Sequence, residues 1–135
     1  MPRERLQIVL DENLPWSIAA ELRNRGHPAT SCSALNATGL RDPEWLEIVA
    51  KLATPSVLVT FDNSMHIEHE TWLTRLGITL ATIDSKRRPA QLTVDRYWRD
   101  VIHRHAHRFG EQEPGSWWKY RQAMRRRLGA WVSNS

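Results

Sequence analysis

The chain has 135 residues, of which 41% are hydrophobic and 25% are charged. This length suits one ordinary domain, and this composition excludes a disordered, collagen-like or coiled-coil chain. No apolar run approaches the roughly 20 residues that span a bilayer, and the apolar stretch near the N-terminus is too short for a signal peptide. We therefore expect a soluble, cytoplasmic protein with no membrane partner. The single cysteine, Cys32, excludes an internal disulfide and a cysteine-based zinc or redox motif.

Charge is divided unevenly along the chain. Up to residue 85 there are 7 Lys and Arg against 11 Asp and Glu, a net charge of −4, whereas from Lys86 onward there are 12 against 4, a net charge of +8. An acidic part that binds a cation and a basic part that binds a polyanion would explain this division. A solvated basic tail without a partner would explain it equally well.

The first elements along the chain are a strand and a helix. Residues 7–10 (QIVL) form a short apolar run that predicts a buried strand ending at Asp11. Pro15 suits the first turn of a helix, and apolar residues then recur at every fourth position until Gly26. Residues 28–32 predict a second, weaker strand.

The next segment continues the alternation of helices and strands. Asp42 is well placed as a helix N-cap, with Pro43 at the first helical position. The clearest strand follows over 56–60, then a short helix around 70–73 and a fourth strand over 78–83. This alternation predicts βαβ units, and hence a parallel sheet in the order 2-1-3-4 with helices on both faces.

The basic part beyond Pro89 is expected to be wholly helical. A continuous apolar stripe from Val94 to His105 predicts a helix that docks on the sheet. After a linker over 109–115, the spacing of the remaining apolar residues predicts a final helix with one basic face; these residues are Trp117, Tyr120, Met124, Leu128 and Trp131. We expect one domain over 1–135, with an α/β core of 1–88 and a basic helical extension of 89–135.

Acidic residues fall at one edge of the predicted sheet. Asp11 follows the first strand and Asp62 the third, which are neighbours in the expected order, and Asp42 begins a helix at the same edge. Ligands of open parallel sheets bind at this carboxyl edge. Converging carboxylates raise one another's pKa unless a cation shares the site, and Mg²⁺ or Mn²⁺ suits such oxygen ligands. Helix capping is an alternative explanation for each aspartate taken singly.

These residues resemble a known family. The segments LDENLP (10–15), RGH (25–27), DPE (42–44) and VLVTFD (57–62) are similar, in order and spacing, to those of the PIN-like domains of VapC-type toxins, over about residues 6–85. The resemblance implies a PIN-like three-layer α/β/α fold and a magnesium-dependent ribonuclease. Such enzymes are commonly the toxin of a type II toxin–antitoxin pair, so the implied partners are an RNA substrate, an antitoxin protein and a second copy in a homodimer.

The resemblance also assigns roles by position. Three residues match the catalytic, metal-binding acids of the family: Asp11, Asp42 and Asp62. Three neighbours could complete the metal shell: Asn13, Glu44 and Asn63. Met65 and His66 stand where larger PIN domains carry a fourth aspartate. Either activity is incomplete, or the missing role shifts to Asn63, Glu12 or Asp84.

The residues themselves favour metal-assisted hydrolysis of a phosphodiester, with Asp11 and Asp62 as direct ligands. Phosphate contacts are expected from the basic part: Lys86, Arg87, Arg88, Lys119, Arg121, Arg125, Arg126 and Arg127. An unpaired base could stack on an aromatic residue of the same part: Trp117, Trp118 or Tyr120. Two alternatives stay open, a non-catalytic nucleic-acid-binding module and a phosphoacceptor receiver-like domain in which Asp62 is phosphorylated.

Overall fold

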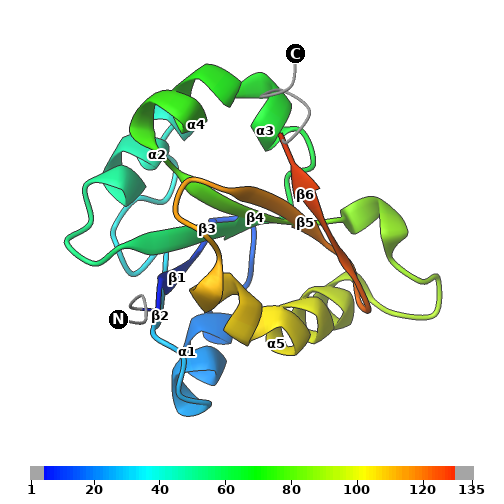
Figure 1. Cartoon of the computed structure of the whole chain (residues 1–135). Coiled ribbons are helices and arrows are strands. Elements are labelled where there is room, and N and C mark those ends of the chain that lie inside the picture. Colours follow the sequence, from blue (N-terminus) through cyan, green and yellow to red (C-terminus); the bar gives the residue numbers. More distant parts are fainter. Residues whose placement is uncertain (1–4, 130–135) are drawn as a thin grey trace.

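Six strands form one sheet with helices on both faces in the computed structural model, which describes residues 5–129 (Figure 1). The strands lie in the order β2-β1-β3-β4-β5-β6. Neighbouring strands from β2 to β5 are parallel, and β6 is antiparallel to β5. The strands are β1 (Gln7–Leu10), β2 (Ala29–Ser31), β3 (Ser56–Thr60), β4 (Thr79–Ile83), β5 (Trp117–Tyr120) and β6 (Arg125–Leu128).

The helices are divided between the two faces of the sheet. One face carries α1 (Ser17–Asn24) and α5 (Val94–Glu111), which lie below the sheet in Figure 1. The other carries α2 (Asp42–Ala50), α3 (Met65–Glu68) and α4 (Glu70–Leu76), with a 3-10 turn η1 (Ser85–Arg87) after β4. The predicted three-layer α/β/α arrangement is confirmed.

Strand alternation explains why the strands read as continuous apolar runs. Successive side chains of a strand point to opposite faces of the sheet. Val57 and Val59 pack in the core that includes α1 and α5, whereas Leu58 between them packs in the core that includes α2 and α4. All three are fully buried. Because both faces are covered, polar residues of β1 and β3 are confined to the strand ends.

The C-terminal region corrects the predicted fold. The first four strands are parallel and in the predicted order 2-1-3-4, but the sheet has six strands and is mixed. The helix predicted from Trp117 onward is wrong, because residues 117–128 form the β5–β6 hairpin. Consequently the basic extension is one helix and a hairpin instead of two helices. Trp131 of the predicted stripe lies outside the described residues.

Two physical reasons account for the hairpin. The segment 117–120 (WWKY) is rich in aromatic residues, which favour strands, and pairing with it satisfies the backbone of β4, which would otherwise be an open edge. Trp117 packs in the α2–α4 core and Tyr120 in the α1–α5 core, so this strand also has two buried faces. Met124, expected on the buried stripe of a helix, is instead 58% exposed in the turn.

The connection from β4 to β5 differs in hand from the earlier ones. From β1 to β2 the chain steps one way across the sheet with α1 on one face. From β2 to β3 and from β3 to β4 it steps the other way with its helices on the opposite face, so these three connections share one hand. From β4 to β5 it keeps that second direction, but α5 lies on the face of α1. This connection therefore has the rarer hand, which parallel βαβ units almost always avoid.

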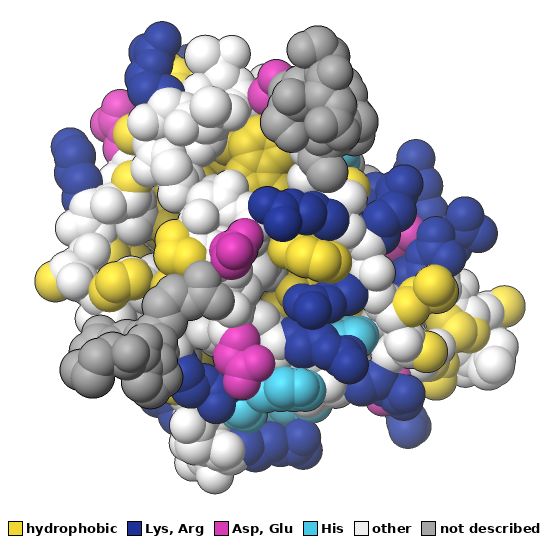
Figure 2. Space-filling model, in the orientation of Figure 1, with side chains coloured by type: hydrophobic (Ala, Val, Ile, Leu, Met, Phe, Trp, Pro, Cys, Tyr) yellow, Lys and Arg dark blue, Asp and Glu magenta, His cyan; other side chains and the backbone are white. Residues whose placement is uncertain are grey.

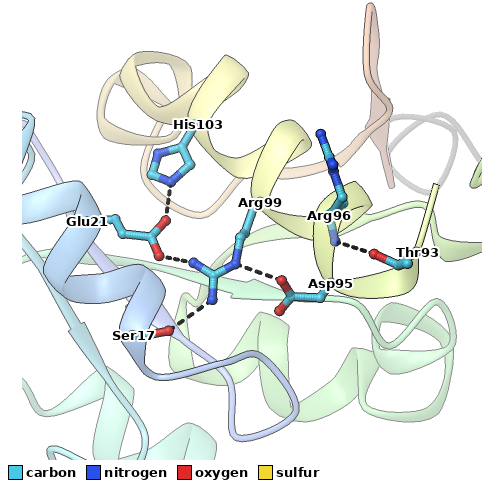
Figure 3. Close-up of polar contacts among 7 residues, drawn as sticks. All are labelled: Ser17, Glu21, Thr93, Asp95, Arg96, Arg99 and His103. Carbon is cyan, nitrogen blue, oxygen red and sulfur yellow. Dashed lines mark hydrogen bonds and ion pairs between the residues drawn. The ribbon is translucent and has the colours of Figure 1, made fainter.

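A polar cluster joins α5 to α1 at the rim of their apolar contact (Figure 3). Arg99 of α5 forms ion pairs with Glu21 of α1 and with Asp95 one turn earlier, and it donates a hydrogen bond to the Ser17 hydroxyl. The Nε2 atom of His103 lies 2.7 Å from the same Glu21 carboxylate. These contacts fix the position of α5 across the sheet.

Candidate functional site

Asp11 is the buried centre of the acidic edge. It directly follows β1, its residue is 6% exposed, and its backbone N–H donates to the Val59 carbonyl of β3 over 2.9 Å. Its Oδ2 accepts a hydrogen bond of 2.6 Å from the Thr60 hydroxyl, and its Oδ1 accepts one of 2.9 Å from the Glu12 N–H. The carboxylate is therefore held in one orientation by groups from two neighbouring strands.

Thr60 links Asp11 to Asp62. Its hydroxyl oxygen, which donates to Asp11, also accepts a hydrogen bond of 3.1 Å from the Asp62 N–H. The Asp62 Oδ1 atom accepts from the backbone N–H and the hydroxyl of Ser64, at 3.0 and 2.8 Å. The Thr-x-Asp spacing was the sequence signal for this arrangement, although it assigned no role to the threonine.

Asp42 is placed at the same edge by the start of α2. The helix begins at Asp42 itself, and no side chain caps it, so the predicted N-cap role is wrong. Its Oδ2 atom instead lies 3.0 Å from Nε2 of His69, the residue between α3 and α4. No local sequence pattern indicated His69, because the pair joins residues 27 positions apart.

The three carboxylates lie in one electrostatic field. Burial raises the pKa of Asp11, and the charges of Asp42 and Asp62 raise it further, whereas the hydrogen bonds from Thr60 and the Glu12 N–H lower it. These opposing effects are those expected where like charges converge at a dry position. We call Asp11, Asp42 and Asp62 the acidic edge.

The predicted neighbours of the acidic edge have different surroundings. Asn13 is exposed, and so is Glu44, which lies 3.8 Å from Arg41 in a surface ion pair. Asn63 donates a hydrogen bond of 2.6 Å to the Ser85 hydroxyl, and its buried Oδ1 atom has no hydrogen-bond partner within residues 5–129. Asn63 is therefore the neighbour with a free, buried oxygen beside Asp62.

The two acids considered as replacements for a fourth aspartate are engaged elsewhere. The Glu12 carboxylate accepts a hydrogen bond of 2.9 Å from the Gly39 N–H. Asp84 is buried after β4, where its carboxylate accepts from the Lys86 N–H at 3.2 Å and from Arg121 Nε at 3.4 Å. Asp84 thus anchors the hairpin to η1.

The comparison with protein families bears on the same residues. The model of a family described as PIN like domain matches residues 6–85, more than half of the chain. The chain belongs to the PIN-like domain family. Domains of this family are typically nucleases and usually use divalent metal ions. Searches of curated proteins and of solved structures found no match.

The donor set of this PIN-like domain fits a divalent ion. Within residues 5–129 no three His, Cys, Asp or Glu side chains already converge closely enough to enclose a metal. Mg²⁺, however, usually keeps several waters and takes only one or two carboxylates from a protein. Asp11 and Asp62 supply such carboxylates, and the orphaned Asn63 Oδ1 offers a further oxygen.

A row of side chains leads from the acidic edge to the β5–β6 hairpin, which lies outside the residues matched by the family model. Thr60 pairs in register with Thr82, Thr82 with Lys119, and Lys119 with Arg126, so these side chains project from one face of the sheet. Neither Lys119 nor Arg126 forms an ion pair with another described residue. We call these two residues the cationic pair.

His66 interacts electrostatically with both the acidic edge and the cationic pair. Burial lowers its pKa, and the charges of Lys119 and Arg126 lower it further, whereas Asp62 and Glu70 raise it. Its buried Nδ1 atom has no hydrogen-bond partner among the residues that the structure describes. Of the two residues that stand in place of a fourth aspartate, His66 is thus the one that interacts with both acidic and basic groups.

The remaining basic residues of the hairpin have partners of their own. Arg125 and Arg127 project from the opposite face of β6 and lie over the ring of Trp118, at 4.3 and 6.0 Å from its centroid. Arg127 also pairs with Glu113 at 3.7 Å. The arginine run predicted as one helix face is therefore divided between the two faces of a strand.

The basic residues of η1 are exposed beside the hairpin. Figure 2 shows Lys and Arg side chains over the right-hand part of the molecule, where η1 and the hairpin lie in Figure 1. Arg87 lies 3.9 Å from the Asp84 carboxylate, and Arg88 donates to the Leu92 carbonyl. Lys86 has its side chain exposed to solvent.

The aromatic residues predicted to stack on a base do not form an open platform. Tyr120 is fully buried, Trp117 packs against the α2–α4 core, and Trp118 packs against the opposite core under Arg125.

None of the helices within residues 5–129 has the length and apolar character needed to cross a membrane.

Proposed function

We propose that this PIN-like domain is a metal-dependent endoribonuclease that hydrolyses phosphodiester bonds at the acidic edge. The observation that carries the proposal is the buried Asp11 carboxylate, held by Thr60 within the field of Asp42 and Asp62. A carboxylate whose pKa is raised by burial, and further by specific like charges, is costly for stability and is typical of functional sites. The family membership supports a nuclease.

Each residue of the acidic edge has a distinct task in the proposed mechanism. Asp11 and Asp62 would hold Mg²⁺ or Mn²⁺, and Thr60 keeps the two aspartates in register. Asp42, held by His69, would act on the ion directly or through a water molecule. When bound, such an ion lowers the pKa of a coordinated water and neutralises charge on the phosphate.

The basic part of the chain is proposed to bind the RNA backbone. Phosphate contacts supply most of the sequence-independent affinity for nucleic acid. Lys119 and Arg126 are the best placed, because they project from the same sheet face as Thr60 and lack competing ion pairs. The exposed η1 residues would extend this surface.

The biological role proposed is that of a cytoplasmic toxin in a type II toxin–antitoxin pair. The support is the resemblance of residues 10–15 and 57–62 to those of VapC-type toxins. The proposal implies an antitoxin protein as partner and permits a homodimer. Expression of the wild-type chain should then slow growth, and expression of Asp11→Asn should not.

Cleavage of a mixed RNA pool by the purified protein tests the enzymatic proposal. We expect cutting with Mg²⁺ or Mn²⁺ and none in EDTA. Asp11→Asn and Asp62→Asn should each lower the rate by at least about 100-fold, the loss seen when a group stabilising transition-state charge is removed. Asp95→Asn is the matched control, because among the described residues this aspartate forms an ion pair only with Arg99 on α5. Tight RNA binding with no cleavage in the presence of either Mg²⁺ or Mn²⁺ would instead establish that the protein is a non-catalytic binding module.

The receiver-like alternative has one observation in its favour. The five parallel strands lie in the order 2-1-3-4-5, which phosphoacceptor receivers also have. In this chain, however, β5 leads into β6, and the β4–β5 connection lies on the face of α1. Incubation with acetyl phosphate and Mg²⁺ should leave Asp62 unlabelled; labelling there would favour the receiver.

A further inference from the structure

A cavity of about 220 Å³ opens beside Asp11, on the side of the sheet away from the hairpin. Its walls come from the segments that follow β1 and β2, and they include Asp11, Glu12, Trp16, Ser33 and Thr38. The hydrogen bond from the Gly39 N–H to Glu12 ties the second segment to the first. The cavity is thus formed by two connected loops at the acidic edge.

Trp16 is the unusual residue of this cavity. It is 69% exposed, although an indole of this size is ordinarily largely buried. It occupies the N-cap position of α1, and its side chain makes no capping hydrogen bond there. Neither the fold nor the cap therefore explains an exposed tryptophan next to the acidic edge.

The lining of the cavity restricts the ligand that it can take. A drug-sized ligand needs roughly 300 to 1,000 Å³, so this cavity suits a smaller group. Among the described residues no Lys or Arg lines it, and the Glu12 carboxylate, together with that of Asp11 when no metal is bound, would repel a phosphate. Burial raises the pKa of the Cys32 thiol to about 11, so that this lining residue stays protonated and is no nucleophile.

A neutral, planar group with hydrogen-bond donors meets all of these conditions. Every nucleobase can stack on an aromatic side chain, whatever the RNA sequence. The exocyclic amines of bases donate hydrogen bonds to hydroxyl and carboxylate oxygens. The Glu12 carboxylate and the hydroxyls of Ser33 and Thr38 are acceptors of this kind in the lining. Bases paired in a duplex cannot enter such a cavity, whereas an unpaired base can.

We propose that this cavity binds one unpaired nucleobase of the RNA, stacked on Trp16, next to the phosphate at the acidic edge. The proposal rests on the proposed function in taking RNA as the ligand. The RNA would then cross the carboxyl ends of the strands, with its base near β2 and β1 and its backbone on the cationic pair of β5 and β6. The substrate class is single-stranded RNA or an unpaired segment of a folded RNA.

RNA binding without metal tests this site separately from catalysis. Fluorescence anisotropy in EDTA would compare the affinities of a labelled single-stranded 12-mer, the same sequence as a duplex, and an abasic oligoribonucleotide of equal length. Trp16→Ala should weaken binding of the single strand by about 5- to 150-fold, the value of one stacked base, and leave the abasic oligomer unchanged. Trp16→Phe should retain most of the affinity.

Ile67→Ala is the control, because Ile67 is also 69% exposed but lies on α3, outside the cavity. Circular dichroism should show all variants folded. Unchanged single-strand affinity in Trp16→Ala, or an equal loss for the abasic oligomer, would overturn the proposal. If the wild type binds single strands through Trp16 but cuts no RNA with Mg²⁺ or Mn²⁺, the base site stands and the proposed nuclease fails.

Discussion

At the residue scale, the acidic edge contains a buried carboxylate, that of Asp11, which the packing of the fold does not require. Asp11 is buried, and its neighbours Asp42 and Asp62 carry the same charge. The hydrogen bonds from Thr60 and the Glu12 N–H offset only part of this cost, because the pKa of Asp11 remains raised. A cation at the edge would remove the repulsion, so the metal-free protein is under electrostatic strain at this position.

Substitution of Asp11 by asparagine is expected to stabilise the metal-free protein at neutral pH. The pKa of Asp11 is raised in the folded state above its ordinary value of 3.8. Above that pH the native state binds more protons than the unfolded state, so its stability falls as pH rises through the folded pKa. Urea unfolding in EDTA from pH 4 to pH 8 should therefore show that the stability of Asp11→Asn relative to the wild type increases as the pH rises.

The control for this prediction is Asp95→Asn, which removes an exposed carboxylate paired with Arg99. It should keep the pH dependence of the wild type. A lower stability of Asp11→Asn at pH 7, with the pH dependence unchanged, would contradict the prediction. Magnesium should raise the melting temperature of the wild type and have little effect on Asp11→Asn.

How far the site could be predicted from sequence depends on whether a residue's position follows from backbone topology. Asp11 and Asp62 were found because the ends of neighbouring parallel strands must meet. Thr60 was visible only as part of a motif, and the contact between His69 and Asp42 could not be predicted, because it depends on how α2 packs beside α4. Trp16 gave no signal, since exposure of a side chain is a property of the assembled surface.

At the element scale, the hairpin separates basic residues that are adjacent in the sequence. Arg126 projects beside Lys119 toward the face of the acidic edge, whereas Arg125 and Arg127 lie over Trp118 on the other face. A helix was wrongly predicted from Trp117 onward because the apolar residues of this segment are three or four positions apart, as in a helix. The structure shows that this spacing spans two strands and the turn between them. The longer apolar stripe from Val94 to His105 did predict α5, although this helix runs on to Glu111, into the predicted linker.

The two faces of β6 should contribute differently to RNA binding. Arg126→Gln and Lys119→Gln should each weaken binding of a single-stranded RNA and reduce the slope of log K against log salt by about 0.7, as for one lost phosphate contact. Arg127→Gln is the matched control, because Arg127 neighbours Arg126 but pairs with Glu113 and Trp118. Equal changes of slope in Arg126→Gln and Arg127→Gln would show that strand face is irrelevant.

At the scale of the whole molecule, the region beyond the family match completes the core. Tyr97, Val101, Ile102 and Phe109 of α5, together with Tyr120 of β5, are fully buried against the α1 face of the sheet. Without them, the apolar side chains of β1, β3 and β4 on that face would be open to water. The matched residues 6–85 therefore depend on the C-terminal region for much of the layer that covers the α1 face of their sheet.

A chain ending at Arg88 should consequently fail to fold. We expect no cooperative thermal transition by circular dichroism and strong binding of a hydrophobic dye, since the α1 face of the sheet has lost much of its cover. A chain ending at Gly129, which keeps every strand and helix named above, should melt cooperatively. Cooperative unfolding of the shorter chain would show that residues 1–88 are an autonomous domain.

The edges of the sheet have a consequence for self-association. A strand without a neighbour exposes backbone groups to which another chain can pair, and short strands or charged side chains oppose such pairing. Among the described strands the two outermost are β2, which has only three residues, and β6, whose first three residues are all arginine. Arg125, Arg126 and Arg127 would thus repel the same edge of a second molecule, so neutralising all three should promote aggregation even where no RNA is present.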